Sequence, residues 1–386
     1  MTQEPNIFPY IARLLQGEEV VWKPLGEVAD FQNGFAFKSN LFRDDGEAIV
    51  RITNIDGKSV DLSDVKYFSI SDYSTNMSPY KINKGDILIA MSGATTGKIG
   101  FYNYEYTSYL NQRVGKFIPK THILNNRYLY HYLLSKVEEI YIIAGGGAQP
   151  NLSSNKLMEK IQIPLPPLSV QQEIVRILDK FTELEAELEA ELDCRKRQYE
   201  YYRNKLLSYE GNEVEWKTLG EVCINIFSGK NKDRNDNASY PIYGSTGIIG
   251  KTNKKAFSSK QILVARVGAN AGYVHIAEGE YDVSDNALII QHNENINLKF
   301  LYYILVNIKL NQYAKGGGQP LITARELKSI IIPLPPLEEQ QRIASILDKF
   351  NTLVNSISEG LPKEITLRRK QYEYYREKLL TFTNDK

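Results

Sequence analysis

Ile163-Pro-Leu-Pro-Pro-Leu168, followed by Gln171-Gln172 and by Ile177-Leu-Asp-Lys-Phe181, occurs twice in this chain. The second copy begins 169 positions later and consists of Ile332-Pro-Leu-Pro-Pro-Leu337, Gln340-Gln341 and Ile346-Leu-Asp-Lys-Phe350. A further shared segment, Arg195–Leu207, reappears as Arg368–Leu380 at an offset of 173. A period of this length indicates two copies of a whole domain and not a solenoid of small repeats.

Length and composition fit two domains of ordinary size. The chain has 386 residues, of which 42% are hydrophobic and 24% charged, and no apolar run approaches the roughly 20 residues that cross a bilayer. The first ten residues have neither a basic head nor an apolar core, so we expect a cytoplasmic protein. Cys194 and Cys223 lack metal-ligand spacing to the four histidines, and we interpret both as unpaired thiols.

The net charge of +1 hides an uneven distribution. Residues 20–167 contain 16 basic and 14 acidic side chains, and residues 214–336 contain 14 and 10. The stretch 168–213 between them contains 7 basic and 11 acidic side chains. Positive charge is therefore moderately concentrated in two lobes, as expected of surfaces that meet a polyanion, but below the balance of a strongly basic DNA-binding domain. If the chain holds nucleic acid, we expect other chains to share that work.

The repeats predict a head-to-tail pair of units, each made of one lobe and one long helix. Val21-Trp-Lys-Pro-Leu-Gly-Glu-Val28 opens the first lobe, and Glu215-Trp-Lys-Thr-Leu-Gly-Glu-Val222 opens the second. The predicted divisions are an N-terminal segment (1–21), a first lobe (22–167), a central helical spacer (168–213), a second lobe (214–336) and a C-terminal helical spacer (337–386).

Each lobe is predicted to be a small mixed α/β domain. Strand-like runs include Lys84–Ala90 and Lys260–Ala265, and amphipathic helices are expected at about 126–140 and 298–313. Each lobe ends in a glycine triplet, Gly145-Gly-Gly-Ala-Gln-Pro150 or Gly316-Gly-Gly-Gln-Pro320. The triplet is a plain flexible turn or, alternatively, a loop that brings backbone N–H groups close to phosphate.

The helical stretches carry the apolar spacing of a coiled-coil seam, at positions 174, 177, 181, 184 and 188 and again at 343, 346, 350, 353 and 357. The 42 residues from Leu168 to Tyr209 would reach roughly 60 Å as one helix. A helix of that length with one apolar stripe needs a partner, and the chain contains its own repeat. The change of offset from 169 to 173 falls in Ser358–Lys363, where Gly360 and Pro362 should kink or break the second helix. The predicted fold class is therefore α+β: two mixed lobes separated by two long helices that pair as an antiparallel coiled coil, with an internal pseudo-two-fold repeat.

The sequence contains no recognisable catalytic motif. Gly93-Ala-Thr-Thr-Gly-Lys98 resembles a phosphate loop, but it has three residues between its glycines and Ile99 after the lysine. The matching Gly268-Ala-Asn-Ala-Gly272 has no lysine. Pro-Leu-Pro-Pro-Leu also lacks the flanks of a base-methylating Asn-Pro-Pro-Tyr site, and no nucleophile elbow or zinc spacing occurs. We expect a scaffold without catalysis of its own and without a cofactor or metal.

The two lobes share a framework that carries different polar residues. The framework is an Ile-Leu-Ile/Val-Ala strand, a Gly-Ala-x-x-Gly loop and an asparagine, Asn111 or Asn286, fourteen residues beyond the second glycine. Arg, Asn, Gln, Ser and Thr suit base edges and phosphates, although each such residue can equally be a solvated loop residue or turn former. The candidate DNA-binding residues are Arg51, Thr53, Asn54, Ser92, Thr95, Thr96, Lys98, Gln112 and Arg113 in the first lobe and Tyr243, Ser245, Thr246, Lys251, Arg266 and Asn270 in the second.

A series of four motifs occurs twice in the chain: Gly-Gly-Gly-(Ala)-Gln-Pro, Ile-Pro-Leu-Pro-Pro-Leu, Gln-Gln-x-Ile and Ile-Leu-Asp-Lys-Phe. With this duplicated series, the chain resembles the specificity subunit of type I restriction-modification enzymes over essentially its whole length. The resemblance implies that each lobe is a target-recognition domain for one half of a bipartite double-stranded DNA site. It also implies that the helices form an antiparallel spacer and dock methyltransferase subunits, two being expected. S-adenosylmethionine-dependent adenine methylation and ATP- and Mg-dependent cleavage would belong to methyltransferase and restriction/translocase partners. The competing classes are a stand-alone DNA-binding regulator, which should carry a helix-turn-helix or a more basic lobe, and an assembly scaffold that binds no DNA.

Overall fold

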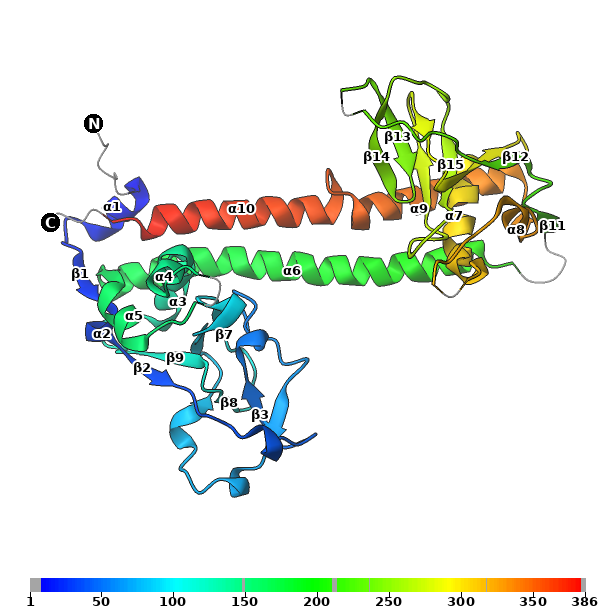
Figure 1. The fold of residues 1–386 in the computed structure, drawn as a ribbon. Helices are drawn as coiled ribbons and strands as arrows, with labels where there is room; N and C mark the ends of the chain where they lie inside the picture. The colour runs from blue at the N-terminus through cyan, green and yellow to red at the C-terminus, as the bar shows by residue number, and fades with distance from the viewer. Residues whose placement is uncertain (1–7, 148–149, 210–213, 236, 317, 383–386) are drawn as a thin grey trace. The chain divides into compact units, whose positions relative to one another are not determined.

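The computed structural model describes residues 8–147, 150–209, 214–235, 237–316 and 318–382. The chain forms two compact units, which Figure 1 draws in one ribbon. The first unit contains residues 1–187 and 366–386, and the second contains residues 188–365. Each unit thus combines one lobe with helical segments from both copies of the repeat.

The first lobe is built on two four-stranded sheets. One has the strand order β2-β9-β6-β7 and the other β4-β3-β8-β5. The central strand β6 is buried at every position, in agreement with the predicted strand 84–90. The strands of this lobe are β2 (Ala29–Asn33), β3 (Glu47–Val50), β4 (Lys66–Phe68), β5 (Lys81–Ile82), β6 (Ile87–Ala90), β7 (Ile99–Phe101), β8 (Ser108–Leu110) and β9 (Val114–Pro119).

Four short helices accompany these sheets. The predicted helix at 126–140 is present as two helices, α3 and α4, which are separated by Lys136. Asn125 caps α3 by accepting hydrogen bonds from two backbone N–H groups of its first turn. The helices are α2 (Leu25–Val28), α3 (Asn126–Ser135), α4 (Val137–Ile143) and α5 (Ser154–Lys160), with single-turn 3-10 helices η1 (Ser39–Leu41), η2 (Ile52–Asn54), η3 (Ile70–Asp72), η4 (Ser78–Tyr80) and η5 (Gly93–Thr95).

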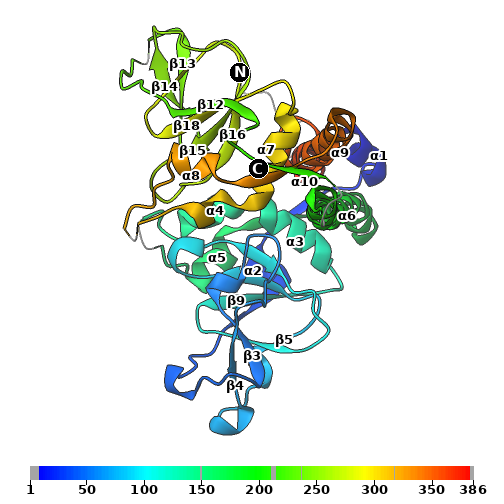
Figure 2. The same ribbon diagram turned by 90° about the vertical axis from the view of Figure 1, so that its right-hand side faces the viewer.

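The second lobe repeats this plan with fewer residues. A four-stranded sheet, β12-β18-β15-β16, corresponds to β2-β9-β6-β7, and a three-stranded sheet, β14-β13-β17, stands beside it (Figure 2). Asn297 caps α7 as Asn125 caps α3. The elements are β12 (Cys223–Ser228), β13 (Tyr240–Gly244), β14 (Gly247–Thr252), β15 (Gln261–Ala265), β16 (Val274–Ala277), β17 (Asp282–Val283), β18 (Ala287–His292), α7 (Leu298–Ile308), η6 (Leu310–Tyr313) and α8 (Ala324–Lys328).

The proline-rich motif closes each lobe as a two-stranded ribbon. Strand β10 (Gln162–Leu165) pairs antiparallel with β1 (Val21–Pro24), and β19 (Ile331–Leu334) pairs with β11 (Glu215–Thr218) in the same register. The first Ile-Pro-Leu of each motif is therefore extended, as expected from its prolines. A long helix begins directly after the second proline of each pair, at Leu168 and at Leu337, because proline is compatible with the start of a helix.

A buried glutamine fastens each long helix to its lobe. Gln171 is fully buried; its amide nitrogen donates to the carbonyls of Ile123 and Pro166, and its oxygen accepts from the N–H of Asn125, at 2.8–2.9 Å. The second copy, Gln340, makes the corresponding three bonds in its own lobe. This explains why the first glutamine of the Gln-Gln pair recurs.

The helical spacers follow the prediction, with one difference between the copies. Helix α6 (Leu168–Leu207) is continuous over 40 residues. Its counterpart is divided into α9 (Leu337–Asn355) and α10 (Gly360–Leu380), as predicted from Gly360. Gly360 has φ +76, and an added Cβ would lie 2.6 Å from the carbonyl oxygen of Thr352, so only glycine fits this break. The proposed seam position Ile357 is wrong, because Ile357 lies in the break and is 87% exposed.

Within the first unit, the beginning of α6 pairs antiparallel with the end of α10. Phe181 stacks on Tyr375 with ring centroids 5.2 Å apart, and the buried Glu185 binds the guanidinium of Arg369 at 2.7 Å. Contacts that advance along α6 retreat along α10, which is the antiparallel arrangement. A short helix, α1 (Pro9–Leu15), adds Ile11 and Leu15 to the same hydrophobic core, so the N-terminal segment is part of the packing.

Within the second unit, the corresponding motifs pack together, but here the phenylalanine comes from the second repeat and the tyrosine from the first. Phe350 of α9 stacks on Tyr202 of α6 at 5.7 Å, just as Phe181 stacks on Tyr375. In both units, the Ile-Leu-Asp-Lys-Phe motif of one repeat therefore packs against the Tyr-Glu-Tyr-Tyr-Arg motif of the other. Leu178 and Leu347, which were not assigned to the seam, are fully buried in the hydrophobic cores of their units.

The aspartate of this motif ties helix to lobe. Asp179 binds Arg127 and the Nε2 of His131 in α3, and the Nδ1 of His131 lies 2.9 Å from the Tyr372 hydroxyl. Burial alone would raise the pKa of Asp179, but His131 and Arg127 hold it below its ordinary value. In the second unit, Asp348 accepts instead from Lys299 and Tyr303. Among the described residues, no helix is long and apolar enough to span a membrane.

Candidate nucleic-acid interface

The first-lobe candidates lie where several strands end. Arg51 directly follows β3, Ser92 follows β6 by two residues, and Gln112 and Arg113 connect β8 to β9. Backbone hydrogen bonds hold these segments together: the N–H of Met91 donates to the Arg113 carbonyl at 2.8 Å. The N–H of Asn111 donates to the Val50 carbonyl at 3.1 Å. The N–H of Ala90, at the end of β6, donates to the Lys98 carbonyl at 3.0 Å. The sheets therefore gather residues from four segments at one end of the lobe.

Two of these candidates are unsuited to base contacts. Asn54 is buried, its oxygen accepts from the Arg51 N–H, and its amide donates to the carbonyls of Asp61 and Asp64. Thr96 is also buried, and its hydroxyl donates to the Gly93 carbonyl at 2.7 Å. Both side chains already use their polar atoms to shape loops, so both are corrected to structural residues.

The remaining first-lobe candidates differ in the exposure of their side chains and in their hydrogen-bond partners. Thr53, Gln112 and Arg113 are exposed, and Lys98 is half-buried. The Arg51 guanidinium faces Asp64 at 3.6 Å, while its Nε is buried without a hydrogen-bond partner. The hydroxyls of Ser92 and Thr95 are likewise buried without partners among the described residues. Unsatisfied polar atoms are costly in a folded protein, and a ligand could satisfy them.

The second-lobe candidates gather at the corresponding end. Tyr243 lies in β13 beside β17, and its carbonyl accepts from the Ser284 N–H at 2.9 Å. The Arg266 N–H donates to the Asn286 carbonyl at 2.8 Å. The Ser245 hydroxyl reaches the same Asn286 carbonyl at 3.4 Å. Thr246 and Asn270 are exposed in nearby turns. Lys251 stands apart, since it pairs with Pro241 farther along the β13–β14 hairpin.

The Tyr243 ring is fixed by aromatic neighbours. It lies against His275 with centroids 6.1 Å apart and meets the buried Tyr281 edge-on at 5.2 Å. Both ring nitrogens of His275 are buried without partners among the described residues, and burial lowers the pKa of His275 to about 4. A neutral imidazole at neutral pH therefore supports Tyr243 as an aromatic surface and adds no positive charge.

The Gly-Ala-x-x-Gly loops have the same geometry in both lobes. Gly93 and Gly268 both have φ +78, and their N–H groups donate to Pro150 and Pro320, the prolines that follow the glycine triplets. The loop continues into a β-strand, β7 or β16, and not into the helix that a phosphate loop requires. Of the triplets, Gly317 lies outside the described residues, as do Ala148 and Gln149, so the phosphate-facing alternative stays untested.

The predicted equivalence of Asn111 and Asn286 is wrong. In the β6–β9 pair Ala90 faces Val114, and in the β15–β18 pair Ala265 faces Ala287. The residue before each partner, Arg113 or Asn286, is therefore the structural counterpart. The second lobe is two residues shorter between the loop and this strand, which shifts the apparent sequence match. Gly34 and Gly229 confirm the corrected register, because their added Cβ atoms would clash with the carbonyl oxygens of Asn111 and Ser284.

The sequence interpretation also missed a basic group beside the β13–β14 hairpin. Lys230, Lys232 and Arg234 follow β12, and Arg234 packs over Gly250 with 3.7 Å separating its side chain from a Cβ added there. Three basic residues in five positions are visible in the sequence, but their approach to Lys251 depends on the fold. The N–H of Asn235 donates to the Lys251 carbonyl at 2.9 Å, which brings the two segments together.

Within the ranges that the structure describes, no set of three His, Cys, Asp or Glu side chains could hold a metal ion. Cys194 is exposed and Cys223 is buried, and both are free thiols as expected. Burial raises the pKa of Cys223 to about 12, so this thiol is protonated at neutral pH. The side chains gathered at the strand ends are polar, aromatic and basic.

Comparison with known proteins identifies the family. The family described as the type I restriction modification DNA specificity domain matches residues 17–193 and 212–367. The specificity subunit of the EcoR124I/EcoR124II type I restriction enzyme of Escherichia coli is 34% identical, with 97% of each chain covered. A putative type I specificity subunit of Haemophilus influenzae is also 34% identical, covering 97% of this chain and 98% of the relative.

Two solved structures share the fold at lower identity. The S subunit of a type I restriction-modification system from M. genitalium has a TM-score of 0.61 at 17% identity and covers 95% of this chain and 98% of its own. A chain from a study of complex assembly and conformational transition of the type I system has a TM-score of 0.58 at 19% identity, covering 94% and 98%. The duplicated lobes, the helical motifs and these matches agree, and the chain belongs to the specificity subunits of type I restriction-modification systems.

Proposed function

We propose that this chain recognises DNA for a type I restriction-modification complex, and that each lobe reads one half of a bipartite asymmetric site. The observation that carries this proposal is that both lobes share one backbone framework but carry different polar side chains on it. In both lobes the Gly-Ala-x-x-Gly loop lies beside the strand ends, and its first glycine, Gly93 or Gly268, has the same φ of +78. At the corrected equivalent positions, the first lobe has Arg113 where the second has Asn286. Different polar groups on one scaffold suit different base edges.

The proposal divides the remaining candidates between base reading and positioning. Arg113 and Arg266 follow strand ends and could make bidentate contacts with guanine. Lys251 lies in the β13–β14 hairpin, and Lys230 and Arg234 lie in the segment beside it; these three residues suit phosphates. Thr53, Gln112, Ser245, Thr246 and Asn270 are short or amide side chains at the same ends. Modest net charge in each lobe means that isolated binding would be weak and sensitive to salt.

The helices would set the spacing of the two half-sites. The 40 residues of α6 correspond to about 60 Å of continuous helix, and the Gln171 and Gln340 bonds fix each lobe to its own helix. Half-sites about one helical turn apart, roughly 34 Å, would then be read on one face of the DNA. The helices would also dock methyltransferase subunits, two of which a duplicated spacer could accept.

Catalysis would reside in partner chains. We propose that S-adenosylmethionine binds the methyltransferase subunits and that ATP and Mg serve restriction/translocase subunits where a system has them. The chain itself would hold none of these cofactors and would act in the cytoplasm, where its DNA target lies. Its contribution is to position DNA and partners, which its rigid lobe-to-helix attachments support.

The test compares the chain alone with the chain in its complex. Purified chain, S-adenosylmethionine and duplex DNA should give no methyl transfer, whereas addition of methyltransferase subunits should give adenine methylation at one bipartite sequence. Methylome sequencing of cells with and without the chain should show the same sequence appear and disappear. Methyl transfer by the chain alone, or a methylation pattern unchanged by its removal, would refute the proposal.

A further inference from the structure

In the first lobe, the outer edge of the main sheet is covered by the chain itself. Strand β7 is the edge strand, and the segment Lys58-Ser59 lies along it as an isolated bridge from Ser59 to Phe101. The Phe101 N–H donates to the Lys58 carbonyl at 3.0 Å, and the Tyr130 hydroxyl donates to the same carbonyl at 2.8 Å. One carbonyl thus satisfies both a sheet-edge N–H and a tyrosine of α3.

The second lobe has the same edge without this cover. Ile276 corresponds to Phe101, because Ile262 faces Ile276 as Ile87 faces Phe101. Tyr302 corresponds to Tyr130, since each is the fifth residue after the asparagine that caps its helix. Among the described residues, β16 pairs only with β15, and neither the Ile276 N–H nor the Tyr302 hydroxyl has a partner outside its own element.

The difference follows from the length of one connection. In the first lobe, residues 51–65 join β3 to β4 and supply the covering segment. In the second lobe, only Ser245 and Thr246 join β13 to β14, and a two-residue turn cannot reach β16. Uncovered edge strands readily pair with other chains, and natural proteins usually cover or charge them.

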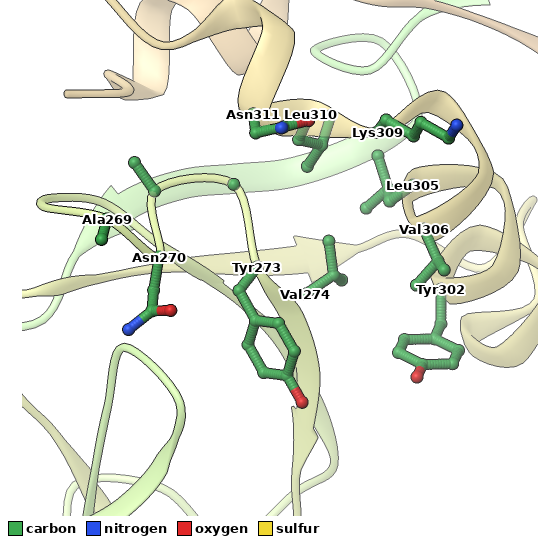
Figure 3. Close-up of a pocket in the computed structure, with 12 residues that line it drawn as sticks. Ala269, Asn270, Tyr273, Val274, Tyr302, Leu305, Val306, Lys309, Leu310 and Asn311 are labelled. Carbon is green, nitrogen blue, oxygen red and sulfur yellow. The ribbon is translucent and has the colours of Figure 1, made fainter. Parts of the chain in front are cut away.

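A cavity of about 440 Å³ adjoins this open edge. Its apolar and aromatic lining includes Tyr273, Val274, Tyr302, Leu305 and Val306, and Figure 3 shows Val274 between the rings of Tyr273 and Tyr302, with Leu305 and Val306 above Tyr302 in the view. The apolar floor would accept one aliphatic or aromatic side chain. Lys309 also lines the cavity and makes no ion pair with the described residues, so an acidic residue beside that anchor would complement it.

We propose that the β16 edge and this cavity bind an extended segment of a methyltransferase subunit by strand addition. The inference rests on the proposed function for the identity of the partner. The Lys58-Ser59 segment is its internal template: a main-chain carbonyl of the partner accepts from the Ile276 N–H and the Tyr302 hydroxyl. The neighbouring apolar side chain enters the cavity, and main-chain pairing of this kind supplies affinity while the pocket supplies specificity. The first lobe, whose edge is already covered, does not offer this site.

The test uses the full chain in complex with methyltransferase subunits. Hydrogen exchange of the β16 amides should slow at least tenfold on assembly, while the covered β7 amides stay unchanged. Ile276→Pro removes only an outward N–H, which edge strands tolerate, and should weaken assembly about tenfold. Tyr302→Phe should weaken it several-fold, whereas the matched control Tyr106→Phe, at an exposed tyrosine of the first lobe, should have no effect.

Each outcome decides the matter. A complex that assembles and methylates its site while β16 exchange is unchanged overturns this inference and leaves the proposed function intact. Slow β16 exchange in the chain alone that depends on its concentration identifies a second copy as the occupant and also overturns it. Failure of the wild-type chain to assemble with methyltransferase subunits overturns the proposed function and this inference together.

Discussion

Replacing Gln171 by methionine tests how the long helix is fastened to the first lobe. Methionine has a similar length and no hydrogen-bonding amide, so Gln171→Met removes three buried hydrogen bonds at 2.8–2.9 Å. At about 1 kcal/mol for each bond, with some additional cost for partners left unsatisfied, the expected loss is about 3 kcal/mol. The exposed neighbour Gln172→Met should change stability by less than about 0.5 kcal/mol.

The assay follows thermal unfolding and amide exchange at the start of α3. A loss of about 3 kcal/mol in a unit of this size should lower its Tm by roughly 6–12 °C. Because the chain has two units, exchange of the Leu129 N–H, which donates to the Asn125 carbonyl in the first turn of α3, reports the first unit separately. Gln340→Met should act equally in the second unit. A Gln171→Met chain as stable as Gln172→Met would refute the role assigned to this clamp.

Three further predictions concern the site, the pH response and the repeat. Arg113→Ala or Arg266→Ala should cost about 1–3 kcal/mol and relax one position of the recognised sequence, measured by methylome sequencing; a uniform loss across sequences would indicate a phosphate contact instead. Because burial lowers the pKa of His275 to about 4, only the unfolded chain binds this proton between about pH 6.5 and 4. The free energy of unfolding should therefore decrease by up to about 3 kcal/mol as the pH is lowered from about 6.5 to 4. Denaturant titrations should show a smaller decrease for His275→Phe, and an unchanged decrease for the exposed control His122→Phe. A fragment of residues 1–211 should dimerise in light scattering through its own seam and, with methyltransferase subunits, direct modification to a palindromic interrupted site; a monomer, or an unchanged asymmetric site, would contradict this.

The repeated motifs allowed the helices, their break at Gly360 and the extended proline segments to be predicted from sequence. These features depend on local backbone preferences and on apolar spacing, which a sequence displays directly. The role of Gln171 could not be predicted, because its partners Ile123 and Asn125 lie about 46–48 residues away and approach only after folding. Ile357 continued the apolar spacing and yet is exposed, because the break at Gly360 ends the seam before it.

The candidate site was predicted by residue type and place, and the structure refines it by burial. Asn54 and Thr96 have the side chains of base-reading residues, but both are enclosed by loops whose carbonyls they bind. The shared asparagine misled the alignment of the lobes, because a two-residue deletion brings Arg113 and not Asn111 to the place of Asn286. The basic group at Lys230–Arg234 depends on the course of a loop, which periodicity does not predict.

Independent reading of two half-sites is the central claim, and exchange of one lobe tests it most directly. Residues 22–160 would be replaced by the corresponding lobe of another family member, keeping Gln171 and both helical spacers. Methylome sequencing of cells that carry the chimera and the methyltransferase subunits should show one half of the recognised sequence changed, with the other half and the spacing retained. A change in both halves, or in neither, would contradict the account.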